Sequence, residues 1–171
     1  LSMSDMMRLQ RDLGLRIIGA AGMLHAYDAE SKQIFYTTDN VSFRDLWVVD
    51  PKTGAAEMLL KDARIGDLVL NPADRSLWGV RHFNGFATLV RIPHPYDRWE
   101  QIHTWPYGEV LYDLDISPDG ALLSASIGGI DGNHTLNVWQ TAALVAGETE
   151  PVQRHAFGVT IPSNFVFSPD G

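Results

Sequence analysis

One pattern, an apolar stretch followed by a tight turn and a second apolar stretch, recurs along this chain at intervals of roughly 40 to 50 residues. Its clearest copy occupies residues 109–140, where the turn Ser-Pro-Asp-Gly (117–120) separates two apolar stretches. Proline presets φ at the first central turn position, and glycine adopts the positive φ that other residues resist. This copy predicts three antiparallel strands, at 111–116, 121–127 and 135–139. Such a meander cannot bury both faces alone, so other segments must cover it.

Looser copies precede and follow this stretch. Their turns lie at 28–31, 71–74 and 168–171, and the first two are followed by strand-like segments at 33–37 and 45–50, and at 76–80 and 88–92. Further candidate strands lie between the copies, at 56–60, 100–105 and 152–157. About four short strands in each unit is typical of the blade of a β-propeller.

The predicted fold is therefore all-β, with about three and a half four-stranded antiparallel blades that belong to a larger propeller. We place the units at about 24–66, 67–110 and 111–160, with the start of another at 161–171. Residues 4–13 predict a short helix, for which Ser4 is a suitable N-cap and Gly14 a suitable end. Residues 1–14 are thus expected to form a helix or linker before the partial propeller at 15–171.

The recurring residues resemble a known repeat. The segments LDISPDGALLSAS (114–126) and NFVFSPDG (164–171) resemble the TolB-like, WD40-like (PD40-type) propeller repeat, and LWVVD (46–50) resembles its last strand. The resemblance extends over residues 24–171. The second turn, 71–74, lacks the glycine, and the Gly-His and Trp-Asp pairs of true WD40 repeats are missing.

The resemblance implies a fold and several functions. The repeat occurs in bacterial periplasmic TolB, in the propellers of prolyl-oligopeptidase-type and tricorn-type peptidases, and in lactonase-like propellers. A bacterial periplasmic or other extracytoplasmic location is implied by this resemblance alone.

Composition excludes several classes of partner. The formal net charge of −8 argues against binding to a nucleic-acid backbone or to an anionic membrane surface. No apolar run of about 18 residues predicts a membrane span. The absence of cysteine excludes disulfides and thiolate-ligated metals.

No catalytic motif is present. The six histidines form neither His-x-x-x-His nor His-Glu-x-x-His, and no serine has the Gly-x-Ser-x-Gly context. Asp131-Gly132-Asn133 lacks the further carboxylates of a calcium loop, which favours a turn. Asp113 and Asp115 are expected to share one strand face, opposite Tyr112 and Leu114, as a carboxylate pair or as hydrogen-bond acceptors. We expect no catalytic residue, bound metal or cofactor.

The loops between the second and third strands of each unit are the predicted binding surface. These loops combine arginine with aromatic residues that are expected to be exposed, which is the composition of interaction hot spots. The alternative is that the phenylalanines are buried beneath the loops. His82 and His134 occupy equivalent loops, where they either converge or remain solvated. The candidate binding residues are Phe43, Arg44, Arg81, His82, Phe83, Asn84, Phe86, Asp131, Asn133 and His134.

Ring closure is a separate expectation. Propellers close with about four to eight blades, and this chain holds three units and the start of a fourth. An open blade face must be covered by a partner, by a second copy of the chain or by a C-terminal continuation, and the position of Gly171 directly after a turn favours the continuation.

Two functions follow. The first is a non-catalytic propeller that presents its loops to a protein or peptide. The second is the propeller portion of a larger hydrolase, most plausibly a peptidase, which gates or shapes substrate access while the catalytic residues lie elsewhere. A lactonase-like site in the central channel is a weaker third option.

Overall fold

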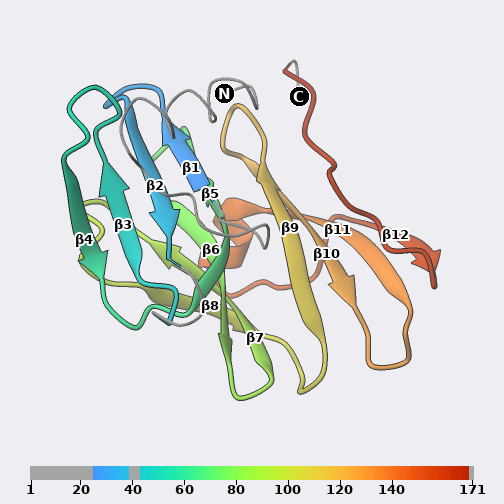
Figure 1. The fold of residues 1–171 in the computed structure, drawn as a ribbon. Helices are drawn as coiled ribbons and strands as arrows, with labels where there is room; N and C mark the ends of the chain where they lie inside the picture. The colour runs from blue at the N-terminus through green and yellow to red at the C-terminus, as the bar shows by residue number, and fades with distance from the viewer. Residues whose placement is uncertain (1–24, 39–42, 170–171) are drawn as a thin grey trace.

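The computed structural model describes residues 25–38 and 43–169, and within them three four-stranded antiparallel sheets lie side by side (Figure 1). The expected helix at 4–13, residues 39–42 of the first loop and the last two residues of the final turn lie outside the described residues. The strands are β1 (His25–Asp28), β2 (Gln33–Thr37), β3 (Leu46–Val49), β4 (Ala56–Leu60), β5 (Ile65–Leu70), β6 (Leu77–Phe83), β7 (Phe86–Ile92), β8 (Glu100–Thr104), β9 (Val110–Ile116), β10 (Leu122–Gly128), β11 (His134–Gln140) and β12 (Gln153–Gly158).

Each sheet is a simple meander, with strands in the orders β1 to β4, β5 to β8 and β9 to β12. The first strands of the three sheets, β1, β5 and β9, are neighbours, so each sheet is one blade that begins at the propeller axis. We number the blades 1 to 3. The four-stranded blades confirm the predicted propeller architecture.

Two apolar cores lie between the blades rather than inside any one of them. The first joins blades 1 and 2 through fully buried side chains such as Phe35, Leu46 and Ile65. The second joins blades 2 and 3 around Trp78, Leu123 and Trp139. Because every blade shares its faces with its neighbours, the blades depend on each other for burial.

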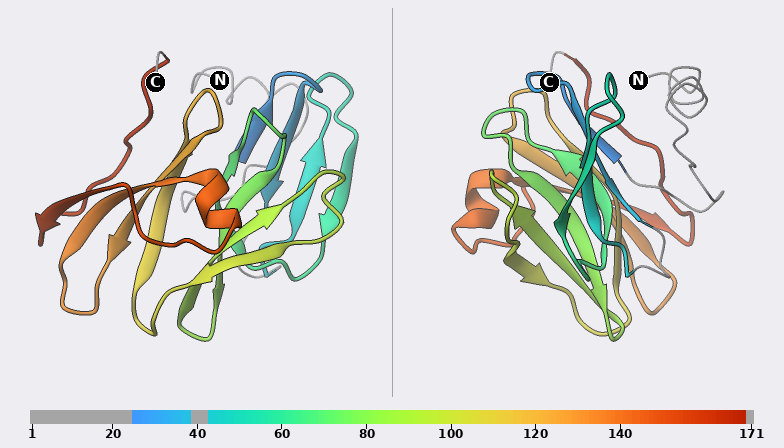
Figure 2. Two further views of the ribbon diagram at one scale, coloured as in Figure 1. Left: turned by 180° about the vertical axis from the view of Figure 1, so that it is seen from behind. Right: turned by 60° about the vertical axis from the view of Figure 1, so that its left-hand side comes forward.

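One short helix, α2 (Thr141–Val145), follows the third strand of blade 3. It packs against β11 and reaches β8 of blade 2, and it is seen clearly from behind in Figure 2. Buried Leu144 joins the second core. The sequence pattern did not predict this helix.

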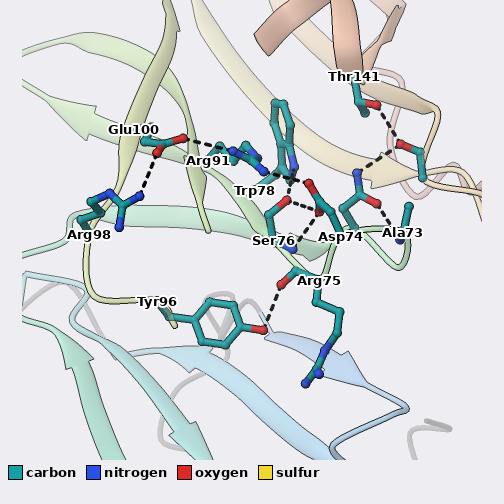
Figure 3. Close-up of polar contacts among 12 residues, drawn as sticks. Ala73, Asp74, Arg75, Ser76, Trp78, Arg91, Tyr96, Arg98, Glu100 and Thr141 are labelled. Carbon is teal, nitrogen blue, oxygen red and sulfur yellow. Dashed lines mark hydrogen bonds and ion pairs between the residues drawn. The ribbon is translucent and has the colours of Figure 1, made fainter. Parts of the chain in front are cut away.

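The turns after the inner strands connect adjacent blades by hydrogen bonds (Figure 3). The Asn71 side-chain amide and the Thr141 hydroxyl both donate to the Gly120 carbonyl oxygen. Between blades 1 and 2, Arg75 donates to buried Asp28 over 2.6 Å. The repeated turn therefore also fastens each blade to the next.

The predicted loop at 81–86 is wrong in its length. Residues 81–83 continue β6, Phe86 begins β7, and only Asn84 and Gly85 form the connection. Both residues have positive φ, at 49° and 81°, as expected of a two-residue hairpin turn built on Asn-Gly. The strands therefore run to the end of the blade.

The predicted alternation in β9 is also wrong. The pairing of β9 with β10 shifts between Ser124 and Ser126, so Leu111 and Ile116 face the core while Tyr112 is only half-buried. The irregularity coincides with Asp113, whose φ is 53°. A β-bulge inserts one extra residue, so the side chains that precede it lie on the opposite face of the strand from the one that strict alternation predicts.

A positive φ recurs four residues before the turns that begin at residues 71 and 168. Asp67 in β5 has φ of 47°, at a matching register shift, and Asn164 has φ of 59°. The Asn164 N–H donates to Asp113 Oδ2 over 3.2 Å, and the backbone of Asp113 in turn acts to lower the pKa of Asp67. A carboxylate of one blade thus accepts a backbone hydrogen from the equivalent residue of the next.

Candidate functional site: an arginine–aromatic ladder

The predicted binding residues lie on three connections at the same end of the blades, toward the lower edge of Figure 1. The β2–β3 connection holds Phe43 and Arg44, and the β6–β7 hairpin holds residues 81–86. The β10–β11 hairpin holds the remaining three. The structure brings the first two groups together.

A stack of alternating aromatic and guanidinium groups crosses this end. The Arg64 guanidinium lies 4.6 Å from the ring centre of Phe43 and 5.2 Å from that of Phe83. Arg81 lies 5.0 Å from Phe83 and 5.0 Å from Trp99. We call Phe43, Arg64, Phe83, Arg81 and Trp99 the arginine–aromatic ladder. Each contact has the geometry of a cation–π interaction.

The backbone fixes the ladder across two blades. The Arg64 N–H donates to the Phe43 carbonyl oxygen over 2.9 Å, and the His82 N–H donates to the Arg64 carbonyl oxygen over 3.0 Å. Arg81 and Phe83 are two residues apart on β6, so they share one face of the strand. The loop of blade 1, the connection before β5 and strand β6 are therefore held in one arrangement.

The ladder remains accessible to a ligand. Phe43 is 47% exposed, Phe83 43% and Trp99 37%. The possibility that the phenylalanines are tucked beneath the loops is therefore wrong for Phe43 and Phe83.

Three arginines at this end of the blades, Arg44, Arg64 and Arg81, differ from the others in their partners. Among the described residues, every ion pair that an arginine makes involves Arg75, Arg91 or Arg98, and none involves Arg44, Arg64 or Arg81. Burial, and then the charge of Arg64, lower the pKa of Arg81. The Arg81 Nε is buried and has no hydrogen-bond partner within the described part of the chain. A buried donor of this kind calls for an acceptor.

Arg44 acts on two neighbouring groups. Partial desolvation of the His82 imidazole, and then the charge of Arg44, lower the pKa of His82. Both effects favour the neutral form of His82. The same arginine opposes, but does not overcome, the burial and the Asp113 charge that raise the pKa of Asp67 to about 6.

A pocket of about 210 Å³ adjoins the ladder between blades 2 and 3. Its walls are the β6–β7 hairpin and the start of β9. Phe86, 41% exposed, stacks edge-on against Tyr107 with ring centres 5.6 Å apart. The lining residues are His82, Phe83, Asn84, Gly85, Phe86, Ala87, Glu109 and Val110.

The three candidate residues of the β10–β11 hairpin form hydrogen bonds within blade 3. Asp131 accepts hydrogen bonds from the backbone and the side chain of Asn133, which lower the pKa of Asp131. His134 Nδ1 lies 2.8 Å from the Tyr112 hydroxyl. These contacts form a turn and a side-chain link across blade 3, in which His134 contacts Tyr112.

Metal-ligand and membrane features can be assessed for the described residues. Within residues 25–38 and 43–169, no three His, Asp or Glu side chains gather in a way that would hold a metal ion. No helix in the same part of the chain is long and apolar enough to cross a membrane.

Two ladder residues were not among the predicted candidates. Arg64 lies in the connection between units, where the turn pattern carries no information. The five tryptophans recur with the strands, which predicts that most of them pack the blades. Trp78, Trp105 and Trp139 are buried, as that interpretation requires, but Trp99 is not. The flanking polar residues Asp97, Arg98 and Glu100 were the available signal.

No protein-family model and no curated protein matches the sequence. The fold, by contrast, is clearly similar to solved propellers. A TolB structure from Agrobacterium tumefaciens matches with a TM-score of 0.66 and 16% identity, over 89% of this chain and 57% of that one. TolB from Acinetobacter baumannii gives a TM-score of 0.61 and 9% identity, over 80% and 32%.

The β-propeller domain of the Trilobed protease from Pyrococcus furiosus is also similar, with a TM-score of 0.54 and 11% identity, over 82% of this chain and 45% of that one. The chain spans about half the length of the solved structures that it matches first. The fold is a TolB-like β-propeller.

Proposed function

We propose that this TolB-like propeller is a non-catalytic module that binds a protein or peptide through the arginine–aromatic ladder and the adjoining pocket. The observation that carries this proposal is the ladder itself, in which two arginines without a carboxylate partner among the described residues alternate with three exposed aromatic side chains. Arginine, tryptophan and other aromatic residues dominate the binding energy of protein interfaces.

The rigidity of the site supports the same function. Each ladder residue sits on or beside a blade strand, and the Arg64 backbone ties the loop of blade 1 to β6. A preorganised surface loses little side-chain entropy when a partner binds.

A peptide library displayed on phage and selected against the wild-type chain provides the test. Selected peptides are then measured against the double variant Arg81→Ala, Phe83→Ala and against a control, Lys32→Ala, Lys52→Ala, whose residues are exposed in turns at the opposite end of blade 1. We expect at least tenfold weaker binding to the first variant only, with unchanged circular dichroism. Equal affinity for all three proteins would remove the ladder from the site.

A second function has its own test because peptidase propellers are among the similar structures. In that case this propeller belongs to a larger hydrolase and shapes substrate access. The natural polypeptide, isolated from its source, would then cleave short peptides, and serine-directed or metal-chelating inhibitors would abolish the cleavage. Isolation of an inactive natural polypeptide would leave the binding module as the function.

A further inference from the structure

The ladder carries information about the chemistry of its partner. The chain has a net charge of −8, yet three arginines, Arg44, Arg64 and Arg81, gather at one end of blades 1 and 2. None of them forms an ion pair with a described carboxylate. Asp45, Asp62 and Glu109 lie on connections at the same end, so the arginines are distinguished by their lack of ion pairs and not by a net positive charge of the surface.

The stacking geometry limits how these arginines can be neutralised. A guanidinium whose faces lie against aromatic rings keeps its N–H donors at the edge of the plane. The guanidinium carbon of Arg64 lies over the rings of Phe43 and Phe83, and that of Arg81 lies over the rings of Phe83 and Trp99. The edges of both guanidinium groups suit a carboxylate, which accepts two parallel N–H bonds.

The Arg81 guanidinium has one donor that no described residue satisfies. The Arg81 Nε is shielded from solvent and lacks a partner among the described residues. A buried donor without an acceptor is costly, so an acceptor from a ligand would remove that cost.

The surroundings favour a peptide over an extended polyanion. Exposed Phe43, Phe83 and Phe86 lie beside the arginines, and the pocket between blades 2 and 3 is lined partly by apolar side chains. A polyphosphate chain has no apolar group that could contact these side chains. A peptide supplies carboxylates and apolar side chains together.

We propose that the arginine–aromatic ladder binds an acidic peptide segment, with side-chain carboxylates on the edges of Arg64 and Arg81 and a neighbouring apolar side chain in the adjoining pocket. This inference rests on the proposed binding function and specifies its ligand.

Fluorescence anisotropy with three labelled 12-residue peptides tests it. The first alternates glutamate with leucine, the second has glutamine in place of glutamate, and the third has lysine. We expect the acidic peptide to bind at least tenfold more tightly than the other two, and its affinity to fall as salt is raised.

Variants then locate the contact. Arg64→Gln with Arg81→Gln should weaken the acidic peptide at least tenfold, while the charge-matched Lys32→Gln with Lys52→Gln should stay within twofold of wild type. Arg64→Lys with Arg81→Lys retains charge but loses the planar fork, so it should recover only part of the affinity.

The outcomes separate the two proposals. Library-selected peptides that need Arg81 and Phe83 but bind equally with glutamine in place of glutamate would overturn the acidic-peptide inference and leave the binding function intact. Loss of affinity in the Lys32→Gln, Lys52→Gln variant as well as in the Arg64→Gln, Arg81→Gln variant would also overturn the inference. It would indicate that the peptide responds to the overall charge of the protein rather than to the ladder. Tighter binding of a single-stranded oligonucleotide than of the acidic peptide would overturn the inference and would indicate that the ligand is a polyanion.

Discussion

The Asn71 side-chain amide donates a hydrogen bond of 3.1 Å to the carbonyl oxygen of Gly120, and this bond joins the turns of blades 2 and 3. The contact is possible only because Gly120 has no side chain. A Cβ atom there would overlap Asn71 Oδ1 and would lie 2.6 Å from the Ala73 Cβ. The turn glycine therefore permits both a positive φ and the close approach of the next blade.

Gly120→Val should lower the free energy of unfolding by more than about 1 kcal/mol, because φ is 74° and the new side chain meets the adjacent turn. Gly132→Val is the matched control, since Gly132 has φ of 78° but an added Cβ would meet no described atom within 4 Å. Urea denaturation of both variants should show the larger loss at Gly120. Equal losses would mean that the blade contact contributes nothing.

Asp28→Asn should destabilise the fold by about 1 to 3 kcal/mol at pH 7, because Asp28 is buried and receives the Arg75 guanidinium. Burial opposes ionisation of Asp28, but hydrogen bonds from Ser31, Arg75 and the Glu30 backbone outweigh it and lower the pKa. The stabilisation is thus present above the unfolded-state pKa and is lost as pH falls through the lower folded-state value.

The control for this ion pair is Glu30→Gln. Glu30 is also near Arg75, but its side chain is 76% exposed and the contact is 3.4 Å long. Its removal should change stability by less than about 0.5 kcal/mol. Thermal melts between pH 2 and 7 should separate the two variants at pH 7, and the difference should shrink only as the pH falls below about 4.

Asp67→Asn should stabilise the chain at pH 8 by about 2 kcal/mol. Burial, and then the charge of Asp113, raise the pKa of Asp67 to about 6, above its unfolded-state value. Ionised Asp67 therefore destabilises the fold as pH rises through about 6, and the penalty is absent below the unfolded-state pKa. Urea midpoints should differ at pH 8 and converge below about pH 4; a difference that persists in acid would point to packing instead.

Asp115→Ala should expose the amide of Phe167. Asp115 Oδ2 accepts that N–H over 2.6 Å, and this contact holds the segment beyond β12 against β9. Hydrogen exchange at Phe167 should accelerate, while the amides of β6 and β7, which are paired within blade 2, should keep their protection. Faster exchange in blade 2 as well would indicate a global loss of stability.

The blades were predictable because the turn repeat and the apolar strands are local signals. Residues 33–37 form a strand with the predicted bounds, and most other strands differ by one to three residues. The helix α2 was not predicted because the segment Thr-Ala-Ala-Leu-Val is too short to show helical periodicity. The bulges were not predicted because an aspartate such as Asp113 does not indicate a positive φ as clearly as a glycine does.

The site was only partly predictable. Phe43, Arg44, Arg81 and Phe83 stood out by their residue types in connections, and the structure brings them together. Arg64 and Trp99 come from connections between blade elements, and their place in the ladder depends on how blade 1 packs against blade 2. Such neighbours are set by the fold and leave no spacing pattern in the sequence.

The left-handed residues Asp67 and Asp113 have a consequence for the spacing of the described blades. The Asp113 carboxylate accepts from the Asn164 backbone, and the Asp113 backbone acts in the same sense on the Asp67 carboxylate, so these contacts run head to tail beside the axis. A hydrogen bond has a nearly fixed length, whereas apolar cores tolerate side chains of varied volume. The angular pitch between blades is therefore set near the axis, and the outer strands are left free to diverge.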